Sequence, residues 1–372
     1  MDIILLSAGL AFIITFFAIP VIIKVTKEKK LFDEPDERKV HKGVIPTLGG
    51  LGIFAGFIIA MLLGVPAGFP YLQYFTAACI VIFFLGFKDD ILIISASKKF
   101  IGQLIAAGIL IKFGGVQITN MHGLLGIYEL PNVASIVLSA FTIIVITNSF
   151  NLIDGVDGLA GTLGLVTSLI FGIYFFNISQ MAYAVMAFAL AGSLISFLIF
   201  NFSPAKIFMG DTGSLLVGLI NSILVIKFIN IASLPTTSFP IEAAPAIGFA
   251  ILLIPLFDTL RVFTLRVIDR RSPFSPDRNH IHHFLLELGF SPKQITLLCV
   301  AVNLLYVGLA YSLRSLGTTS VFGILLLTAL SFTGIVYYFR QKKGAVIENE
   351  PTNTLINSRK FYTLASDTVE AE

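Results

Sequence analysis

Residues 3–23 read IILLSAGLAFIITFFAIPVII, an apolar run long enough to cross a lipid bilayer as one helix. Only Met1 and Asp2 precede this run, and four lysines follow it between residues 24 and 30. Basic residues beside membrane spans collect on the cytoplasmic side. The run also shows no clear cleavage site for a signal peptidase. We therefore expect a retained first span whose N-terminus lies outside.

Ten further apolar runs follow along the chain. The sequence is 56% hydrophobic and 13% charged, with a mean hydropathy of +0.91, values that exclude an ordinary soluble globular domain. We therefore predict an all-α polytopic membrane protein with about eleven transmembrane helices. The expected spans are 3–23, 48–66, 71–87, 100–115, 133–150, 161–177, 181–201, 213–230, 243–262, 294–313 and 320–339.

Positive charge supports one orientation for these spans. With the N-terminus outside, every Lys and Arg falls on the cytoplasmic side except Lys112, Lys227 and Arg314. The C-terminus is then expected to be cytoplasmic. We predict a single transmembrane domain over residues 1–340, followed by a polar, disordered cytoplasmic tail over 341–372. Cys79 and Cys299 lie inside predicted spans and indicate no disulfide.

Five polar clusters interrupt the apolar sequence, and the predicted orientation places all of them on the cytoplasmic face. Ionisable groups beside lipid are costly, so their repeated presence on one face indicates an enzyme with its site there. The clusters are KVHKGVIPTLGG (39–50), KDDILIISASKK (88–99), NSFNLIDGVDGLAGT (148–162), MGDTGS (209–214) and SPDRNHIHH (275–283).

Two of these clusters are rich in oxygen ligands. Asp89 and Asp90 are adjacent where a span leaves the membrane, and neighbouring carboxylates repel unless a cation or a proton separates them. They suit a divalent metal or a general base, or else an ordinary interfacial cap. Asp154 and Asp157 share a face of a helical turn, and two asparagines at the same spacing, Asn148 and Asn151, add amide oxygens of the kind that Mg²⁺ binds. The alternative is a glycine-rich turn between spans.

The last two clusters suggest phosphate recognition. Asp211 lies at the start of a predicted helix, where free amides favour either a phosphate or an N-cap. Arg278 and the histidines His280, His282 and His283 suit a diphosphate or a sugar. A zinc site and a structural histidine cluster are the alternatives, and zinc is disfavoured because no cysteine lies in a loop.

The five clusters, in this order and on one face, resemble the polyprenyl-phosphate N-acetylhexosamine-1-phosphate transferases, which include phospho-MurNAc-pentapeptide translocase. The resemblance covers residues 1–340, and the motif PDRNHIHH is similar to the initiating branch of the family. It implies transfer of N-acetylhexosamine-1-phosphate, above all GlcNAc-1-phosphate, from a UDP-sugar to undecaprenyl phosphate with release of UMP. In that family this step initiates a lipid-linked envelope glycan, for cell wall, O-antigen or other polysaccharide.

The resemblance also implies the setting and the residue roles. It implies Mg²⁺ as cofactor, with Mn²⁺ as a substitute, and a multi-pass protein of the bacterial inner membrane. The expected partners are undecaprenyl phosphate, a UDP-N-acetylhexosamine and the bilayer, with no nucleic acid, and a homodimer is left open. The matching positions are Asp89, Asp90, Asp154 and Asp157 as catalytic residues, Arg278, His280, His282, His283, His41, Lys42 and Asn148 as substrate-binding residues, and Asp211 and Asn151 as metal ligands.

Two other classes share some of these features. A secondary transporter is also polytopic, but its charges lie near the bilayer midplane in broken helices rather than at one face. A CDP-alcohol phosphotransferase shares the DG-x-x-A pattern of DGVDGLA, but that motif requires an arginine where this chain has Gly161. For the transferase, direct attack by the lipid phosphate is favoured over an aspartyl-phosphate intermediate because no single aspartate is marked out as a nucleophile.

Overall fold

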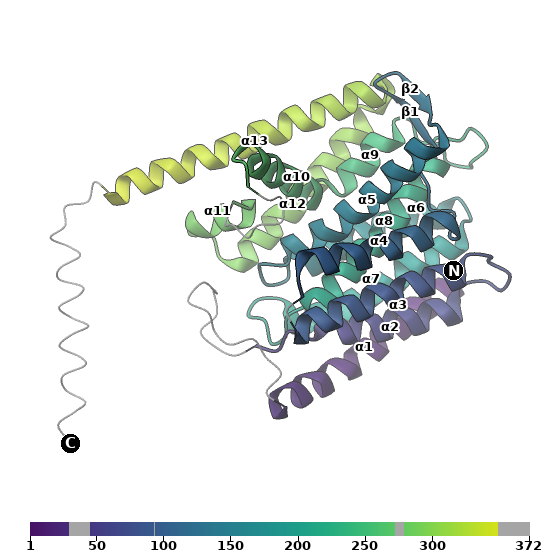
Figure 1. Ribbon diagram of the computed structural model, residues 1–372, viewed down its shortest axis with the longest axis horizontal. Helices are drawn as coiled ribbons and strands as arrows, with labels where there is room; N and C mark the ends of the chain where they lie inside the picture. Colours follow the sequence, from purple (N-terminus) through teal and green to yellow (C-terminus); the bar gives the residue numbers. More distant parts are fainter. Residues whose placement is uncertain (30–44, 93, 272–278, 349–372) are drawn as a thin grey trace.

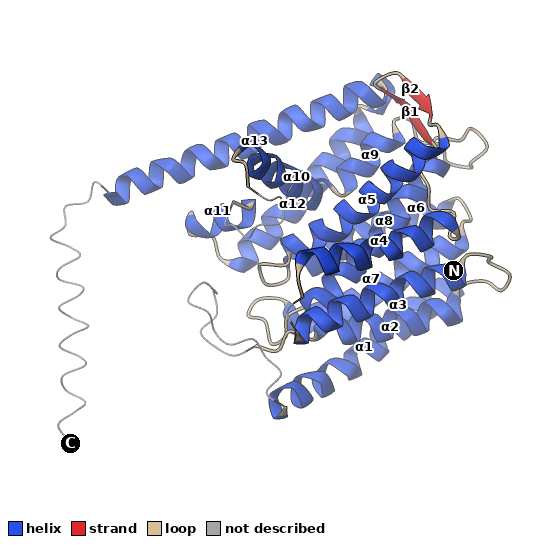
Figure 2. Ribbon diagram, viewed as in Figure 1, coloured by secondary structure: helices blue, strands red, loops and turns tan. Residues whose placement is uncertain are grey.

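The computed structural model describes residues 1–29, 45–92, 94–271 and 279–348, which form a bundle of helices with a small hairpin at one end (Figures 1 and 2). The long helices are α1 (Asp2–Glu28), α2 (Gly49–Gly64), α3 (Leu72–Ile91), α4 (Ala96–Lys112), α5 (Asn132–Ile153), α6 (Leu159–Asn177), α7 (Met181–Asn201), α8 (Gly210–Ala232), α12 (Pro292–Ser312) and α13 (Thr318–Glu348). The short elements are α9 (Ala244–Ile251), α10 (Leu253–Ile268), α11 (Ile281–Glu287), the 3-10 turn η1 (Arg314–Leu316) and the antiparallel strands β1 (Asn120–Leu124) and β2 (Ile127–Glu129).

Helix α8 is the centre of the bundle. It packs against α2, α3, α5, α6, α7 and α9, and 89% of its apolar window is buried inside the protein. The corresponding share for α1 is 22%, and α1 exposes Leu5, Phe17 and Val21. Exposed apolar side chains of this kind suit contact with lipid, whereas α8 is surrounded by other helices.

Glycines allow α2 and α3 to approach the start of α8 very closely. A Cβ atom on Gly50 of α2 would lie 2.2 Å from the backbone nitrogen of Gly213, and one on Gly86 of α3 would lie 2.6 Å from that of Thr212. Real Cβ atoms do not come this close to backbone, so larger residues would push the helices apart. The backbone before α2 also pairs with the backbone before α8: the Gly49 N–H donates to the Phe208 carbonyl over 2.9 Å.

The expected spans agree with the helices in position. Each of the eleven ranges overlaps a helix, and seven helices, or eight if one bent pair is a single span, are long and apolar enough to cross a membrane. The protein is therefore a multi-pass, helical membrane protein. The structure adds the hairpin of β1 and β2, which the all-α prediction did not include.

The predicted span 243–262 is wrong as one straight helix. It consists of α9 and α10, which meet at a bend of 86°. Pro255 lies in the first turn of α10, and its ring is incompatible with a helix that continues from Ile251. Asn303 of α12 binds the two backbone groups that the break leaves free: its Nδ2 donates to the Ile251 carbonyl over 3.0 Å, and its Oδ1 accepts from the Ile254 N–H over 3.3 Å.

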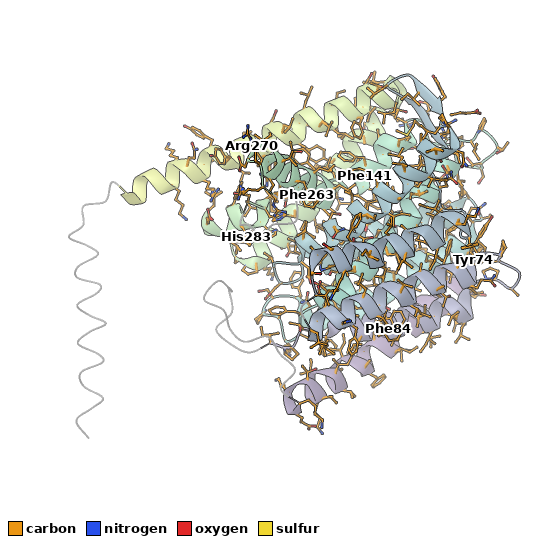
Figure 3. The ribbon with its side chains drawn as sticks, in the orientation of Figure 1. Tyr74, Phe84, Phe141, Phe263, Arg270 and His283 are labelled. Carbon is orange, nitrogen blue, oxygen red and sulfur yellow. The ribbon has the colours of Figure 1, made fainter. Side chains whose placement is uncertain are left out.

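The two ends of the bundle differ in what they contain. The hairpin, the N-terminus and Tyr74 lie at one end (Figure 3). Helix α11 and its residue His283 lie at the other end. Helix α13 runs to Glu348, so residues 341–348, which we expected in the tail, are helical. Residues 349–372 lie outside the described part of the chain.

Candidate active site

Asp90, at the end of α3, caps the start of α8. Its Oδ1 accepts from the Asp211 N–H over 2.7 Å, and its Oδ2 accepts from the Thr212 N–H over 3.0 Å and from the Thr212 hydroxyl over 2.5 Å. Gly86 lies one turn earlier on the same face of α3, so its close approach to α8 positions this carboxylate. Of the two alternatives for these amides, a phosphate or a cap, the structure shows a cap, and it is supplied by Asp90 from another helix. Burial raises the pKa of Asp90 to about 6, although these hydrogen bonds favour its charged form.

Lys99 of α4 joins the second, third and fourth polar clusters. Its Nζ donates to Asp89 Oδ2 over 3.0 Å, to Asn151 Oδ1 over 3.2 Å and to Asp211 Oδ2. The side chains of Lys99 and Asp89 are 17% and 14% exposed, so water screens these contacts only weakly. Burial alone lowers the pKa of Lys99, but Asp211 and Asp89 outweigh it and raise that pKa. Lys99 is therefore a fixed positive charge between two carboxylates.

Asn151 of α5 and Asp211 of α8, the two predicted metal ligands, are in direct contact. Asn151 Nδ2 donates to Asp211 Oδ1 over 2.6 Å and to the Ser214 hydroxyl over 3.0 Å. The oxygen of the Asn151 amide therefore faces Lys99, and its nitrogen faces Asp211. The structure brings the two residues together as predicted, but the amide oxygen is used by the lysine.

Asp154 has the least compensated charge of the site. It follows α5, and no group in the described ranges donates a hydrogen bond to its carboxylate. Burial raises the pKa of Asp154 well above its usual value, and the nearby carboxylates of Asp211, Asp90 and Asp157 raise it further. A cation placed beside Asp154 and Asp211 would relieve this repulsion.

The donor set fits Mg²⁺ better than a metal held by the protein alone. In the described part of the chain, no group of three or more His, Cys, Asp and Glu side chains could hold a metal ion. Mg²⁺ commonly uses one or two carboxylates together with substrate phosphates and water. Asp211, a predicted metal ligand, and Asp154 are the carboxylates available for this role, and the predicted Mg²⁺ site of Asp211 and Asn151 is not tested by the structure.

Asp157 and Asn148 have contacts that fix the protein around the site. The buried carboxylate of Asp157 accepts from the Ala205 N–H over 3.0 Å, and the Asp157 carbonyl accepts from the Thr296 hydroxyl over 3.0 Å. Asn148 exchanges hydrogen bonds of 2.7 and 3.2 Å with Gln103 of α4. Their predicted catalytic and substrate-binding roles are not tested by these contacts.

The histidine cluster is organised by Asp258, a buried residue of α10. Asp258 Oδ2 pairs with His280 Nδ1 at 2.9 Å, and Oδ1 accepts from the Ile281 N–H over 3.0 Å and from Arg261 Nη2 over 2.8 Å. Arg261 also donates to the Asn279 carbonyl. The ionised carboxylate accepts hydrogen bonds only, so His280 carries a proton on Nδ1 and its Nε2 points away from Asp258.

His282 connects this cluster to the turn between α5 and α6, which contains Asp154 and Asp157. Its ring is stacked on that of His280 with centroids 5.6 Å apart, and a Cβ on Gly155 would lie 2.7 Å from His282 Nε2. Burial, and then His283, lower the pKa of His282 to about 3. This shift favours the neutral form of His282 at pH 7. The role of His282 in binding the substrate stays a prediction.

The sequence analysis predicted no role for Lys99, Gln103, Arg261 or Asp258. Asp258 had a signal, because a single acid in the apolar segment PLFDTLRV is itself costly near lipid. His41, Lys42 and Arg278 lie outside the described residues.

Comparison with known proteins gives the family. The profile of glycosyl transferase family 4 matches residues 72–229, which contain Asp89, Lys99, Asn151 and Asp211. The undecaprenyl-phosphate alpha-N-acetylglucosaminyl 1-phosphate transferase of Yersinia pestis is 31% identical, over 76% of this chain and 77% of its own. The chain belongs to this family of polyprenyl-phosphate N-acetylglucosamine-1-phosphate transferases. The match to the family confirms the resemblance seen in the five clusters.

Two other members of the family are similar to this chain over a comparable share of their length. The decaprenyl-phosphate N-acetylglucosaminephosphotransferase of Mycobacterium leprae is 33% identical, over 77% of this chain and 78% of its own. A probable undecaprenyl-phosphate N-acetylglucosaminyl 1-phosphate transferase of Bacillus subtilis is 30% identical, over 82% and 84% of the two chains. The matched region thus extends well beyond the residues of the candidate site.

Proposed function

We propose that this protein transfers GlcNAc-1-phosphate from UDP-GlcNAc to undecaprenyl phosphate, releases UMP and so initiates a lipid-linked envelope glycan. The observation that carries the proposal is the contact of Lys99 with Asp89, Asn151 and Asp211, which joins residues of four helices into one charged site. The names of the similar proteins support both the sugar phosphate and the polyprenyl acceptor.

The proposed reaction is direct attack. An oxygen of the acceptor phosphate bonds to the phosphorus that bears the sugar, and the bond from that phosphorus to the bridging oxygen breaks. UMP leaves with the electron pair of the broken bond. Each reactant is an anion, so the site has to supply positive charge, and Lys99 is one such charge that the chain itself holds.

Mg²⁺ completes the proposal as the cofactor, with Mn²⁺ as a substitute. When bound, it neutralises phosphate charge in the transition state. Asp211 and Asp154 are the carboxylates that would hold it, while Asp89 stays paired with Lys99. His280, whose Nδ1 is held by Asp258, would bind the donor through Nε2.

We also propose the membrane arrangement, eleven crossings of the bacterial inner membrane with the N-terminus outside and the candidate site on the cytoplasmic face. The charge asymmetry of the loops supports it. A cysteine added at residue 2 and one at residue 98, in the native cysteine background, should be labelled from opposite sides of sealed vesicles.

The test of the reaction is UMP release by purified protein supplied with UDP-GlcNAc and undecaprenyl phosphate. We expect release that requires both substrates, stops in EDTA and returns with added Mg²⁺. Full activity in EDTA would remove the metal from the proposal, and release of UMP without the lipid would identify a hydrolase instead.

A further inference from the structure

A second polar feature lies at the end of the bundle opposite the candidate active site. It is a cavity of about 560 Å³ between the hairpin, the segment that joins α8 to α9, and the turn that joins α12 to α13. His122, Ser233, Glu242, Ala243 and Arg314 are among the residues that line it. The hairpin that forms one wall marks this end in Figure 2. We refer to it as the hairpin cavity.

The position of the hairpin cavity matches the depth of lipid head groups. Its walls follow directly after the last residues of α8 (Ala232) and α12 (Ser312), two candidate membrane spans. Asp211 lies at the other end of α8, a helix of 23 residues and so about 35 Å long. Leu234, Phe239 and Leu316, which neighbour the lining residues in sequence, are exposed apolar side chains that suit contact with acyl chains.

The wall of the hairpin cavity contains polar atoms that the described residues leave unpaired. Ser233 Oγ is buried and has no hydrogen-bond partner there. His122 Nε2 is also buried without a partner, although the His122 ring has a backbone contact with Ile229. Buried polar atoms are rarely left in that state without water or a ligand. The backbone is also strained at this wall, since His122 and Ala243 have φ values of 47° and 54°. Such strain is concentrated at functional sites in proteins. The Thr318 hydroxyl holds one of these residues by donating to the His122 carbonyl over 2.6 Å.

The charges of the hairpin cavity are opposite and separate. Glu242 and Arg314 both line it, and among the described residues neither forms an ion pair. Arg314 is held in place by Tyr311, because its Nη1 donates to the Tyr311 carbonyl over 2.8 Å and its guanidinium lies 4.1 Å from the centre of that ring. Burial lowers the pKa of His122, although a backbone hydrogen bond at Ile229 opposes this shift. The cavity thus offers one cationic and one anionic group to the same occupant.

We propose that the hairpin cavity binds the phosphoethanolamine head group of a zwitterionic phospholipid, in the leaflet opposite the candidate active site. The lipid phosphate contacts Arg314, and the ammonium group contacts Glu242. Guanidinium groups with free donors bind phosphate strongly, and a carboxylate completes the recognition of the ammonium. A phospholipid with a neutral polyol in place of the ammonium leaves Glu242 without a partner. The site is independent of the transferase assignment.

The experiment measures lipid retained by the full-length protein in detergent, with native mass spectrometry as the readout. Phosphatidylethanolamine and phosphatidylglycerol with the same acyl chains are offered separately and together, and free phosphoethanolamine is offered as a competitor. The variants are Glu242→Gln and Arg314→Gln. Their matched controls are Glu129→Gln and Lys112→Gln, exposed residues of the same charge that do not line the hairpin cavity. Size-exclusion elution reports whether each variant is folded.

We expect phosphatidylethanolamine to be retained in preference to phosphatidylglycerol, and each cavity variant to weaken that retention about ten- to a hundredfold while the controls do not. Equal retention of the two lipids, or cavity variants that behave as the wild type, would contradict the proposal. Displacement of the lipid by an equal concentration of free phosphoethanolamine would overturn the lipid as occupant, because it would assign the site to a soluble zwitterion. Loss of the folded elution peak in one variant leaves the other variant and the lipid preference to decide.

Discussion

Lys99 is the residue on which the candidate site depends most. Three polar clusters that are far apart in the sequence meet at its Nζ, where Asp89, Asn151 and Asp211 all accept from it. Without the lysine, Asp89 and Asp211 would face each other across a partly buried site with no cation between them. The lysine therefore holds the two carboxylates together before any substrate binds, and its charge opposes the effect of burial, which raises the pKa of Asp211.

Replacing Lys99 should remove most of the activity. Lys99→Gln keeps a hydrogen-bonding side chain but deletes the charge, and we expect UMP release to fall about a hundredfold or more, the scale of an unpaired buried charge. Lys98→Gln is the matched control, since Lys98 is the exposed neighbour of Lys99. Activity of the Lys99 variant within a few-fold of the wild type would show that the carboxylates work without it.

Asp258 has a different, positioning role. Asp258→Asn keeps the size of the side chain but can present a donor to His280 Nδ1, so the imidazole would lose its fixed proton position. We expect the KM for the UDP-sugar to rise about tenfold while the KM for the lipid acceptor stays the same. The dependence of kcat/KM on pH between about pH 6 and 8 should change as well. Asp258→Glu should restore part of the donor affinity, whereas equal damage to both KM values would indicate a merely structural role.

The sequence predicted which residues carry charge at this face but not how they pair. Asp89, Asn151 and Asp211 do come together, as the shared face of the spans required. The cap made by Asp90 could not be foreseen, because it depends on the close packing of α3 on α8 at Gly86. Lys99 could not be separated from the other basic residues that are expected in cytoplasmic loops.

The length of the apolar runs predicted the positions of the helices well, but the sequence did not predict the bend between α9 and α10 or the hairpin. Apolar runs located each long helix, since a spanning helix has to satisfy its own backbone in lipid. The bend between α9 and α10 was missed because Pro255 and the partner Asn303 act together, and Asn303 lies on another helix. The hairpin was missed because its strands are short, lie outside the spans and are held by Thr318 and Thr319 from far along the chain.

The close contact of α3 with α8 at Gly86 should not tolerate a larger side chain. Gly86→Ala would place a Cβ 2.6 Å from the backbone of Thr212, so the helices have to separate and the Asp90 cap has to lengthen. We expect a loss of about 1–3 kcal/mol in stability, as for other overpacked interfaces, together with reduced UMP release. Gly108→Ala on α4 is the control, because no atom lies within 4 Å of its added Cβ. The measurement is thermal unfolding of the two purified variants, Gly86→Ala and Gly108→Ala. Equal unfolding midpoints for the two variants would count against close packing of α3 on α8.

Helix α8 connects the two ends of the molecule, and these ends contain different polar groups. Helix α8 begins at Asp211 beside the carboxylates and ends at Ala232 beside the hairpin cavity. In the proposed membrane arrangement, the candidate site faces the cytoplasm, from which a nucleotide sugar would enter it, while a lipid phosphate would reach it from the bilayer. A site at such a boundary can bring together a water-soluble donor and a lipid acceptor, and it suits direct transfer between the two.

Direct transfer predicts how labelled UMP should exchange into UDP-GlcNAc. The reaction replaces one phosphoanhydride with another, so it should be reversible, and UMP can return only by attacking the lipid-linked product. Exchange should therefore require undecaprenyl phosphate. An aspartyl-phosphate route would instead leave the sugar phosphate on the protein, and UMP would exchange without lipid.

In the structure Asp89 is tied to Lys99, Asp90 caps α8 and Asp157 binds the Ala205 amide, which leaves Asp154 as the aspartate least engaged by hydrogen bonds. The decisive measurement is exchange in thoroughly delipidated protein, with Asp154→Asn beside it. Exchange that persists without lipid and disappears in that variant would establish Asp154 as a nucleophile, whereas we expect no exchange until the lipid is restored.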